Sequence, residues 1–244
     1  MKINASLKKF TLLFILSFAF CVPTNAIAQQ TIKASDILLD MKKGKTISYE
    51  NATITGVLDM TYMDDKLPDL PKKYKFYKNG GTNTVEEAVE NKILFVNCVF
   101  EDDVLAYIHD EDSGYTFVAN FENDVRFKNC KFKKNAMFKY SDFEGNTDFS
   151  GTEFEESSTF KYAEFEKRAS FANTSFEETA IFKYAKFKKG ISFKNAQFQE
   201  DLNLKYTKVN GDFNITGMKV AHEINSKYTS INGKGYSKYL SENN

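Results

Sequence analysis

A lysine followed by a tyrosine recurs through the second half of the chain, and these pairs are the most regular residues able to contact a ligand. Successive pairs stand 22 residues apart, so a fold with one 22-residue unit per layer would stack them in two parallel columns. Ammonium groups beside aromatic rings could hold an anionic or sugar polymer. The pairs are Lys139-Tyr140, Lys161-Tyr162, Lys183-Tyr184, Lys205-Tyr206 and Lys227-Tyr228.

The same columns also have a structural interpretation. Stacked tyrosines cover backbone and stabilise neighbouring layers by about 0.2 to 1 kcal/mol per pair, as cross-strand aromatic pairs do. We favour this structural role and keep polymer binding along the lysine and tyrosine columns as the alternative.

Charged residues recur with the same spacing. An acidic column and a column of mixed sign are both typical of solvated faces, with a cation or a basic partner as the alternative occupant of the acidic one. The acidic column consists of Glu156, Glu178 and Glu200, and the mixed column of Lys133, Glu155 and Glu177.

A cluster of His109, Asp110, Glu111 and Asp112 contains metal-binding residue types. Its spacing does not match an EF-hand loop, and the second histidine, His222, lies far along the chain. We therefore expect a solvated loop here and no metal site.

Cys98 and Cys130 follow matching segments, Phe95-Val-Asn-Cys98 and Phe127-Lys-Asn-Cys130. A disulfide is one interpretation if the protein is exported. Small residues fill the equivalent positions elsewhere, however, and cysteine behaves as a small hydrophobic residue when it is buried. We favour two free buried thiols.

Motifs of nucleophilic catalysis, phosphate loops and zinc sites are missing from the sequence. Arg126 and Arg168 are the only arginines, and neither stands beside an evident pair of carboxylates. We therefore expect no enzymatic activity and no cofactor.

The element that positions these residues is a ladder of phenylalanines, whose spacing alternates between five and six residues without a slip. A fixed period of this kind is typical of a solenoid. The ladder is formed by Phe127, Phe132, Phe138, Phe143, Phe149, Phe154, Phe160, Phe165, Phe171, Phe176, Phe182, Phe187, Phe193 and Phe198.

An α-helix does not fit this spacing, because residues five or six apart fall on nearly opposite sides of a helix. The residue two before each ladder phenylalanine is small in nearly every step, for example Cys130, Ala136 and Ser141. Residues two apart point the same way in extended chain, so each step places one small residue and one ring inside. Short extended segments joined by corners are therefore expected.

These residues resemble the pentapeptide-repeat family, in its variant with a central phenylalanine and an extra residue in alternate steps. Stretches such as Phe149-Ser-Gly-Thr-Glu-Phe154 carry the pattern, which covers roughly residues 93 to 231. The resemblance implies an all-β fold, a right-handed quadrilateral β-helix of about 22 residues per coil. It does not specify a function, because one fold supports many functions.

The N-terminus has the layout of a secretory signal peptide. Lys2, Lys8 and Lys9 precede the apolar run 10–22, and Ala26-Ile27-Ala28 provides a cleavage site before Gln29. A lipoprotein signal would use Cys21, but bulky Phe20 opposes it. We expect cleavage after Ala28, no later transmembrane segment, and location in the periplasm, on the outer surface or outside the cell.

The mature chain is expected to form one domain. Residues 29–46 form a lead and a short N-terminal capping helix, which Ser35 begins as N-cap and Gly44 follows. Residues 47–232 form the solenoid, interrupted by insertions at 61–92 and 106–116, and 233–244 form a polar tail. The first insertion ends in a possible short helix at 85–89, and the second is expected to be a loop. For the first, a packed side loop and a partner-binding loop both remain open.

The charge balance argues against nucleic acid as a partner. The 33 basic residues lose three lysines with the signal peptide, which leaves a small net negative charge against 33 acidic residues. Export and near-neutral charge also fit poorly with the acidic, DNA-mimicking members of the family. We therefore expect a non-enzymatic structural or interaction solenoid at a bacterial cell envelope, with an unidentified protein or envelope polymer as its partner.

Export can be tested directly. Expression of the full chain in a bacterium should yield exported protein that begins at Gln29, because Ala26 and Ala28 fit signal peptidase. N-terminal sequencing and intact mass measure this, with Ala28→Arg as a control that should block processing. An uncleaved chain in the cytoplasm would contradict the expectation.

Overall fold

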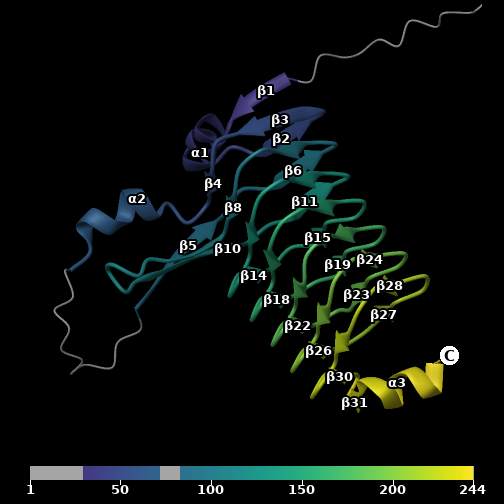
Figure 1. Cartoon of the computed structure of the whole chain (residues 1–244). Helices are drawn as coiled ribbons and strands as arrows, with labels where there is room; N and C mark the ends of the chain where they lie inside the picture. The colour runs from purple at the N-terminus through teal and green to yellow at the C-terminus, as the bar shows by residue number, and fades with distance from the viewer. Residues whose placement is uncertain (1–29, 72–82, 244) are drawn as a thin grey trace, which may run out of the picture.

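The computed structural model describes residues 30–71 and 83–243, and the predicted signal peptide at 1–28 lies outside them. The chain winds into a four-sided solenoid whose coils stack from the N-terminal to the C-terminal end (Figure 1). Four sheets form its sides, and we number these faces I to IV in the order in which each coil visits them from β2 onward. The predicted quadrilateral β-helix is therefore confirmed.

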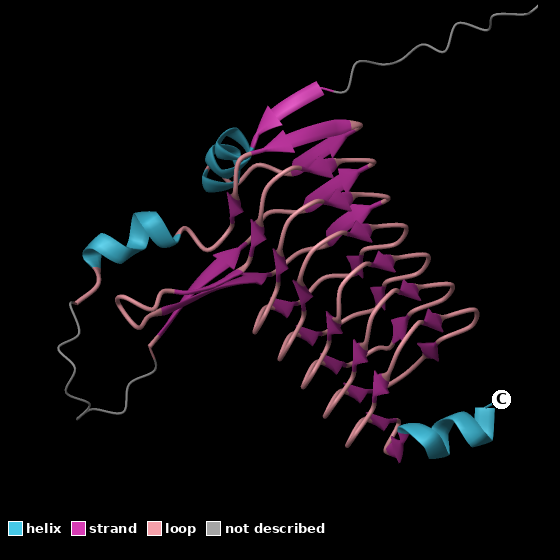
Figure 2. Ribbon diagram, viewed as in Figure 1, coloured by secondary structure: helices cyan, strands magenta, loops and turns pink. Residues whose placement is uncertain are grey.

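Faces I to III are parallel sheets of short strands (Figure 2). Face I contains β2 (Ile47–Glu50), β6 (Ile93–Val96), β11 (Val125–Lys128), β15 (Thr147–Asp148), β19 (Ala169–Ser170), β23 (Ile191–Ser192) and β27 (Phe213–Asn214). Face II contains β1 (Gln30–Lys33), β3 (Ala52–Thr55), β7 (Val99–Phe100), β12 (Lys131–Phe132), β16 (Glu153–Phe154), β20 (Ser175–Phe176), β24 (Gln197–Phe198) and β28 (Lys219–Val220). Face III contains β4 (Leu58–Asp59), β8 (Val104–Leu105), β13 (Ala136–Met137), β17 (Ser158–Thr159), β21 (Ala180–Ile181), β25 (Leu202–Asn203) and β29 (Ile224–Asn225).

Face IV is parallel except where β9 and β31 join it antiparallel. It contains β5 (Thr84–Val89), β9 (Tyr107–His109), β10 (Thr116–Phe121), β14 (Asp142–Phe143), β18 (Glu164–Phe165), β22 (Lys186–Phe187), β26 (Lys208–Val209), β30 (Ser230–Ile231) and β31 (Lys234–Gly235).

The register confirms the 22-residue coil. Lys131 stands beside Glu153 on face II, 22 residues later. The two earlier coils are longer: 46 residues separate the equivalent Asn51 and Asn97, and 32 separate Glu101 and Lys133. The surplus residues are the two predicted insertions.

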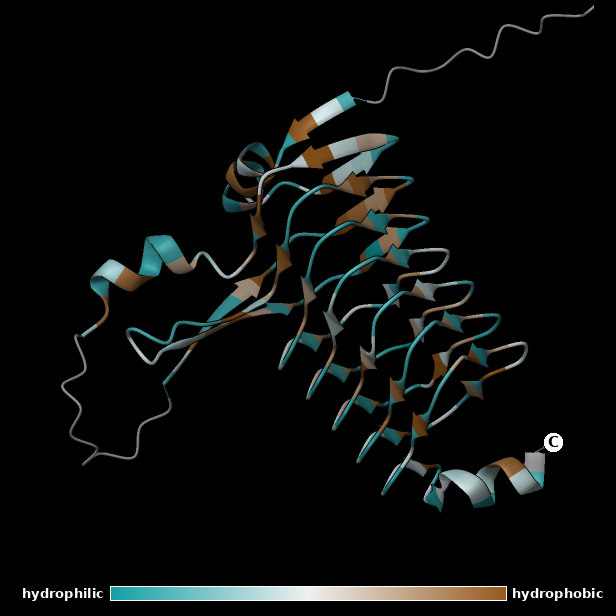
Figure 3. Ribbon diagram, viewed as in Figure 1, coloured by the Kyte–Doolittle hydropathy of each residue, from teal (hydrophilic) through white to brown (hydrophobic). Residues whose placement is uncertain are grey.

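The core is the phenylalanine ladder, and each of its rings is at most 1% exposed. Rings of successive coils stack face to face, for example Phe143 on Phe165 with centroids 4.7 Å apart. The small residues predicted to point inward are buried as well. Four inward threonines donate their hydroxyls to backbone carbonyls, as Thr174 does to Phe149 at 3.1 Å, whereas the buried Thr147 hydroxyl has no hydrogen-bond partner in the described part of the chain. Many of the connecting turns are hydrophilic (Figure 3).

The N-terminal end is closed by α1 (Ala34–Lys42), which buries Ala34, Ile37 and Met41 against the core. The predicted capping helix is therefore confirmed. Its predicted N-cap is wrong: β1 runs straight into the helix, so extended Lys33 holds that position and no side chain caps the first turn.

The C-terminal residues form α3 (Tyr236–Asn243) where the sequence indicated only a polar tail. Tyr236 and Tyr239 lie edge-on to Phe213, with ring centroids 6.2 and 5.8 Å from it. This helix therefore covers part of the last coil. Among the described residues, no helix is both long and apolar enough to cross a bilayer.

The two insertions meet in one projecting element, which we call the wing (Figures 1 and 2). It consists of α2 (Met63–Lys66), the 3₁₀ helix η1 (Leu67–Asp69), β5, β9 and β10. The predicted helix at 85–89 is wrong, because β5 pairs with β10 over its full length. The predicted loop at 107–115 is instead largely the β9–β10 hairpin, with Gly114 in a left-handed conformation at its turn.

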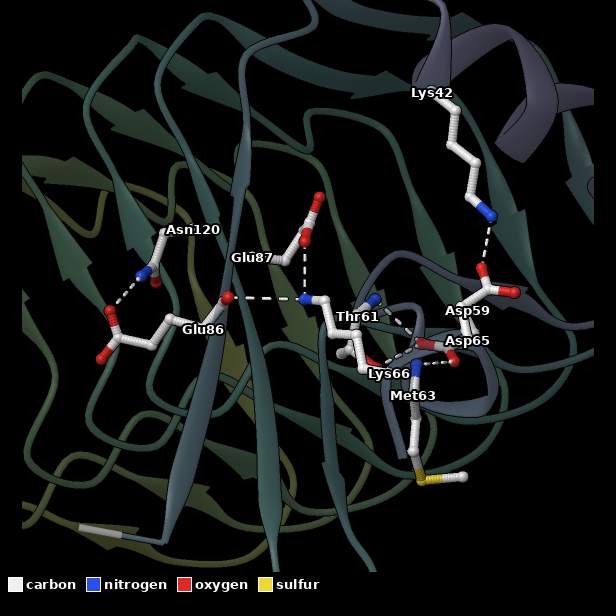
Figure 4. Close-up of polar contacts among 9 residues, drawn as sticks. All are labelled: Lys42, Asp59, Thr61, Met63, Asp65, Lys66, Glu86, Glu87 and Asn120. Carbon is white, nitrogen blue, oxygen red and sulfur yellow. Dashed lines mark hydrogen bonds and ion pairs between the residues drawn. The ribbon is translucent and has the colours of Figure 1, made fainter. Parts of the chain in front are cut away.

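Polar contacts tie the wing to the solenoid and tie its two parts together (Figure 4). The Asp59 carboxylate accepts from the backbone N–H groups of Thr61 at 2.8 Å and Met63 at 3.1 Å, at the start of α2. Lys66 pairs with the Glu87 carboxylate of β5 at 2.5 Å. The Tyr115 hydroxyl donates to the Pro71 carbonyl at 3.1 Å. The first insertion is therefore packed against the second.

The ladder predicts a large loss of stability when one central ring is removed. Phe160→Ala should lower the free energy of unfolding by about 3 to 5 kcal/mol, because it leaves a cavity among stacked rings. The exposed Lys167→Ala should change it by less than about 0.5 kcal/mol. Chemical denaturation of both variants measures this, and equal losses would show that the ladder is not the stabilising element.

Candidate functional site

The predicted tyrosine column is present at the corner between faces III and IV. Each tyrosine lies between a strand of face III and the next strand of face IV, and its ring stacks on those of the neighbouring coils. The ring centroids are 4.8, 4.6, 4.6 and 4.8 Å apart along the series Tyr140, Tyr162, Tyr184, Tyr206 and Tyr228. The central rings are parallel to within 1°.

The lysine of each pair places its ammonium group beside the ring of its own tyrosine. The distances from Nζ to the ring centroid are 4.9, 5.3, 5.3, 5.4 and 5.1 Å along the column. This is the geometry of a cation–π contact. Lys139 also donates to the Tyr107 hydroxyl at 2.8 Å. We call these five lysines and five tyrosines the Lys–Tyr row.

Backbone geometry at this corner is unusual. The five tyrosines have φ between 62° and 64°, in the left-handed region that tyrosine rarely adopts. The N–H of Tyr162 nevertheless donates to the Lys183 carbonyl at 3.0 Å, and its column neighbours repeat this bond. The corner thus continues the hydrogen-bond ladder between coils.

The corner between faces I and II needs the same left-handed conformation, but asparagine or glycine supplies it there. Asn97 donates from its side-chain amide to Asn51 at 3.1 Å, and Asn129 donates to Asn97 at 3.2 Å. Gly151 follows them, and a Cβ atom at this position would lie 2.1 Å from the Asn129 amide oxygen. Sequence reasoning missed this asparagine ladder, although asparagine or glycine at coil spacing was a visible signal.

Two further tyrosines lie at or near the corner between faces III and IV in the long coils that precede the column. Tyr107 lies next to Tyr140, with centroids 5.9 Å apart and rings tilted by 46°. Tyr62 occupies the equivalent left-handed position of the first coil, and Lys42 lies over its ring at 4.9 Å. Burial raises the pKa of Tyr62 to about 12. Both tyrosines escaped notice because the insertions break the 22-residue spacing.

Ring stacking limits what the Lys–Tyr row can bind. Each inner ring is covered on both faces by its neighbours, so sugar rings cannot stack on Tyr162, Tyr184 or Tyr206. Partial desolvation, and to a lesser extent the neighbouring Tyr206 and Tyr162, raise the pKa of Tyr184. Ring edges, hydroxyls and ammonium groups remain available.

The predicted charged columns are present, and a lysine and a histidine lie at the two ends of the acidic one. Lys134 pairs with Glu156 at 2.6 Å, and the ring nitrogen of His222 contacts Glu200 at 2.7 Å. These partners were missed because they stand one coil beyond the acidic run. In the mixed column, Lys133 pairs with Glu101 at 2.9 Å.

The residues around His109 belong to the turn of the β9–β10 hairpin. Its Nδ1 lies 2.9 Å from the Thr116 hydroxyl. Asp110 accepts the backbone N–H of Ser113 at 3.0 Å, and its hydrogen bonds with Ser113 lower its pKa. In the part of the chain that the structure describes, no group of three or more such side chains is arranged to hold a metal ion.

Cys98 and Cys130 are free and buried, as the sequence favoured. Each sulfur lies near backbone carbonyls, for example Cys98 Sγ at 3.3 Å from the Val96 oxygen. Burial raises the pKa of Cys130, whereas the hydrogen bond from Cys130 lowers that of Cys98 to about 7.

Comparison with known proteins identifies the repeat. A family model described as pentapeptide repeats matches residues 119–164 and 160–208, which lie in the regular part of the solenoid. Neither the curated proteins nor the solved structures gave a match.

Stacking within the column can be measured by a double-mutant cycle. Tyr162→Asn and Tyr184→Asn remove two rings in contact, so the effects of the two changes on the free energy of unfolding should be coupled by about 0.5 to 1.5 kcal/mol. Asparagine is chosen because it tolerates the left-handed backbone.

The control cycle uses Tyr140→Asn and Tyr206→Asn, whose rings do not touch. Its two effects should add to within about 0.5 kcal/mol. Additive effects in both cycles would show that ring stacking does not stabilise the column.

Proposed function

We propose that this chain, which belongs to the pentapeptide-repeat family, is a non-enzymatic scaffold that binds its partner through its outer surface. Proteins of this family are generally structural solenoids without catalytic activity. The filled interior carries the proposal: the ladder rings from Phe127 to Phe198 are at most 1% exposed, and Leu204 and Val209 fill the equivalent positions in the coil that follows.

The arrangement of the outer surface supports the same proposal. Three depressions in the described surface lie around α1 and in the wing. The regular coils present straight columns of side chains, and extended surfaces of this kind are what solenoid proteins use for binding. The Lys–Tyr row is the candidate binding surface because it is regular and its side chains are held in place.

The proposal includes export to the cell envelope. Its basis is the N-terminal pattern of lysines, an apolar run and Ala26-Ile27-Ala28. These residues lie outside the described part of the chain, so N-terminal sequencing is the direct test.

A second candidate function is binding of a carbohydrate or an anionic polymer in place of a protein. One observation favours it: ion pairs with carboxylates hold lysines on face II and face IV, such as Lys131 and Lys186, but none is found for the row lysines among the described residues. A line of lysine ammonium groups without carboxylate partners is suited to binding a negatively charged polymer.

Binding through the outer surface can be tested with the mature chain immobilised on a support. It should capture a component of a bacterial envelope extract saturably, with competition by the soluble protein. The variant Lys161→Glu/Lys183→Glu should lose most of this capture, because it reverses charge at the centre of the row.

The control Lys128→Glu/Lys194→Glu makes the same charge change near the corner between faces I and II, where both lysines are exposed. It should capture normally. If the wild-type chain shows no saturable capture, the scaffold proposal fails. If both variants lose capture equally, the row is not the binding surface.

A further inference from the structure

The five lysines of the Lys–Tyr row stand in consecutive coils, and none of them has an acidic partner among the described residues. Lys208 and Lys194 also lack one there, so the distinguishing feature of the row is its unbroken alignment. Lys131, Lys133, Lys134, Lys186 and Lys188 all form ion pairs with a carboxylate of a neighbouring coil. Within residues 30–71 and 83–243, no such pair is found for Lys139, Lys161, Lys183, Lys205 or Lys227. Their positive charges therefore accumulate along one edge of the solenoid.

The backbone under these lysines provides an independent observation. The left-handed corner between faces I and II uses asparagine or glycine, which adopt this conformation at little cost. The corner between faces III and IV uses tyrosine in five successive coils, at a conformational cost that asparagine would avoid. Residues held in such conformations are concentrated at functional sites.

Stacking turns this corner into a rigid support for the charges. Each ring is fixed between its neighbours, and each ammonium group lies about 5 Å from the centroid of one ring. Cations held in place lose less freedom when a ligand binds than free lysine side chains do. The row is therefore preorganised for a ligand that presents negative charges in a line.

The spacing of the row discriminates among linear partners. Neighbouring rings are 4.6 to 4.8 Å apart. Side chains on one side of an extended peptide recur at about 6.6 to 6.8 Å. Phosphates of one DNA strand rise by about 3.4 Å each along the helix axis and wind around it, so they do not form a straight row. The length of one sugar unit in an extended pyranose chain is similar to the spacing between neighbouring coils. Such a chain can therefore present one acidic group to each lysine.

We propose that the Lys–Tyr row binds a linear anionic polysaccharide that runs parallel to the solenoid axis. The ammonium groups contact its acidic groups, and the tyrosine hydroxyls and ring edges contact the sugar units. Neutral glycans are disfavoured, because the inner ring faces are covered. This proposal rests on the proposed binding role of the outer surface and names the partner of that surface.

The test uses dextran sulfate and unmodified dextran, which share a backbone and differ in charge. Mature protein should bind dextran sulfate in calorimetry, more weakly as salt concentration rises, and should not bind dextran. The variant Lys161→Gln/Lys183→Gln/Lys205→Gln should lose about tenfold or more in affinity. The control Lys128→Gln/Lys167→Gln/Lys194→Gln removes the same charge from exposed sites elsewhere and should lose less than about twofold.

Several results would overturn this inference. Equal losses in the two triple variants would show attraction by overall charge, and binding of dextran would show recognition of neutral sugars. Equal affinity for poly-glutamate of similar length would show that an acidic polypeptide fits as well. If the chain captures an envelope component but does not bind dextran sulfate, this inference fails and the scaffold proposal stands. Circular dichroism of each variant establishes that it is folded.

Discussion

The parallel register between successive coils is the constraint on which the rest of the structure depends. A shift of 22 residues places phenylalanine on phenylalanine, as for Phe143 and Phe165, and closes the hydrogen bonds of all four faces. A slip of one residue would turn every ring outward, because side chains alternate along a strand. The outer columns follow from this register, since a surface residue repeated in each unit must align along the solenoid.

Features that repeat were predictable from the sequence alone. The buried ladder, the small residues beside it, the 22-residue coil and the alignment of Tyr162 with Tyr184 all follow from one period. The capping helix was also recognisable, because Gly44 follows its last turn, although Ser35 is not the N-cap. In each case a short stretch of sequence contains the physical requirement that the structure meets.

Features that depend on pairing between distant or non-repeating segments were not predictable. The sequence of β5 predicts a short helix, whereas pairing with β10 makes it a strand. The C-terminal helix was missed because its polar sequence gains order from the contacts of Tyr236 and Tyr239 with Phe213. The left-handed conformation of the column tyrosines was missed for a different reason. Glycine and asparagine are the residues expected in this conformation, but in this solenoid stacking of the rings between coils overrides that preference.

The two insertions lie in the two longest coils, at the corner between faces III and IV. The regular coils that follow all have 22 residues. The solenoid therefore separates an irregular head, formed by the two long coils, from a uniform body. Duplicating one 22-residue unit in the body would add a layer to the core and, at the same time, one lysine and one tyrosine to the row. The number of contacts that the row offers a long partner is thus tied to chain length, so valency can change in whole steps while the head and both ends stay the same.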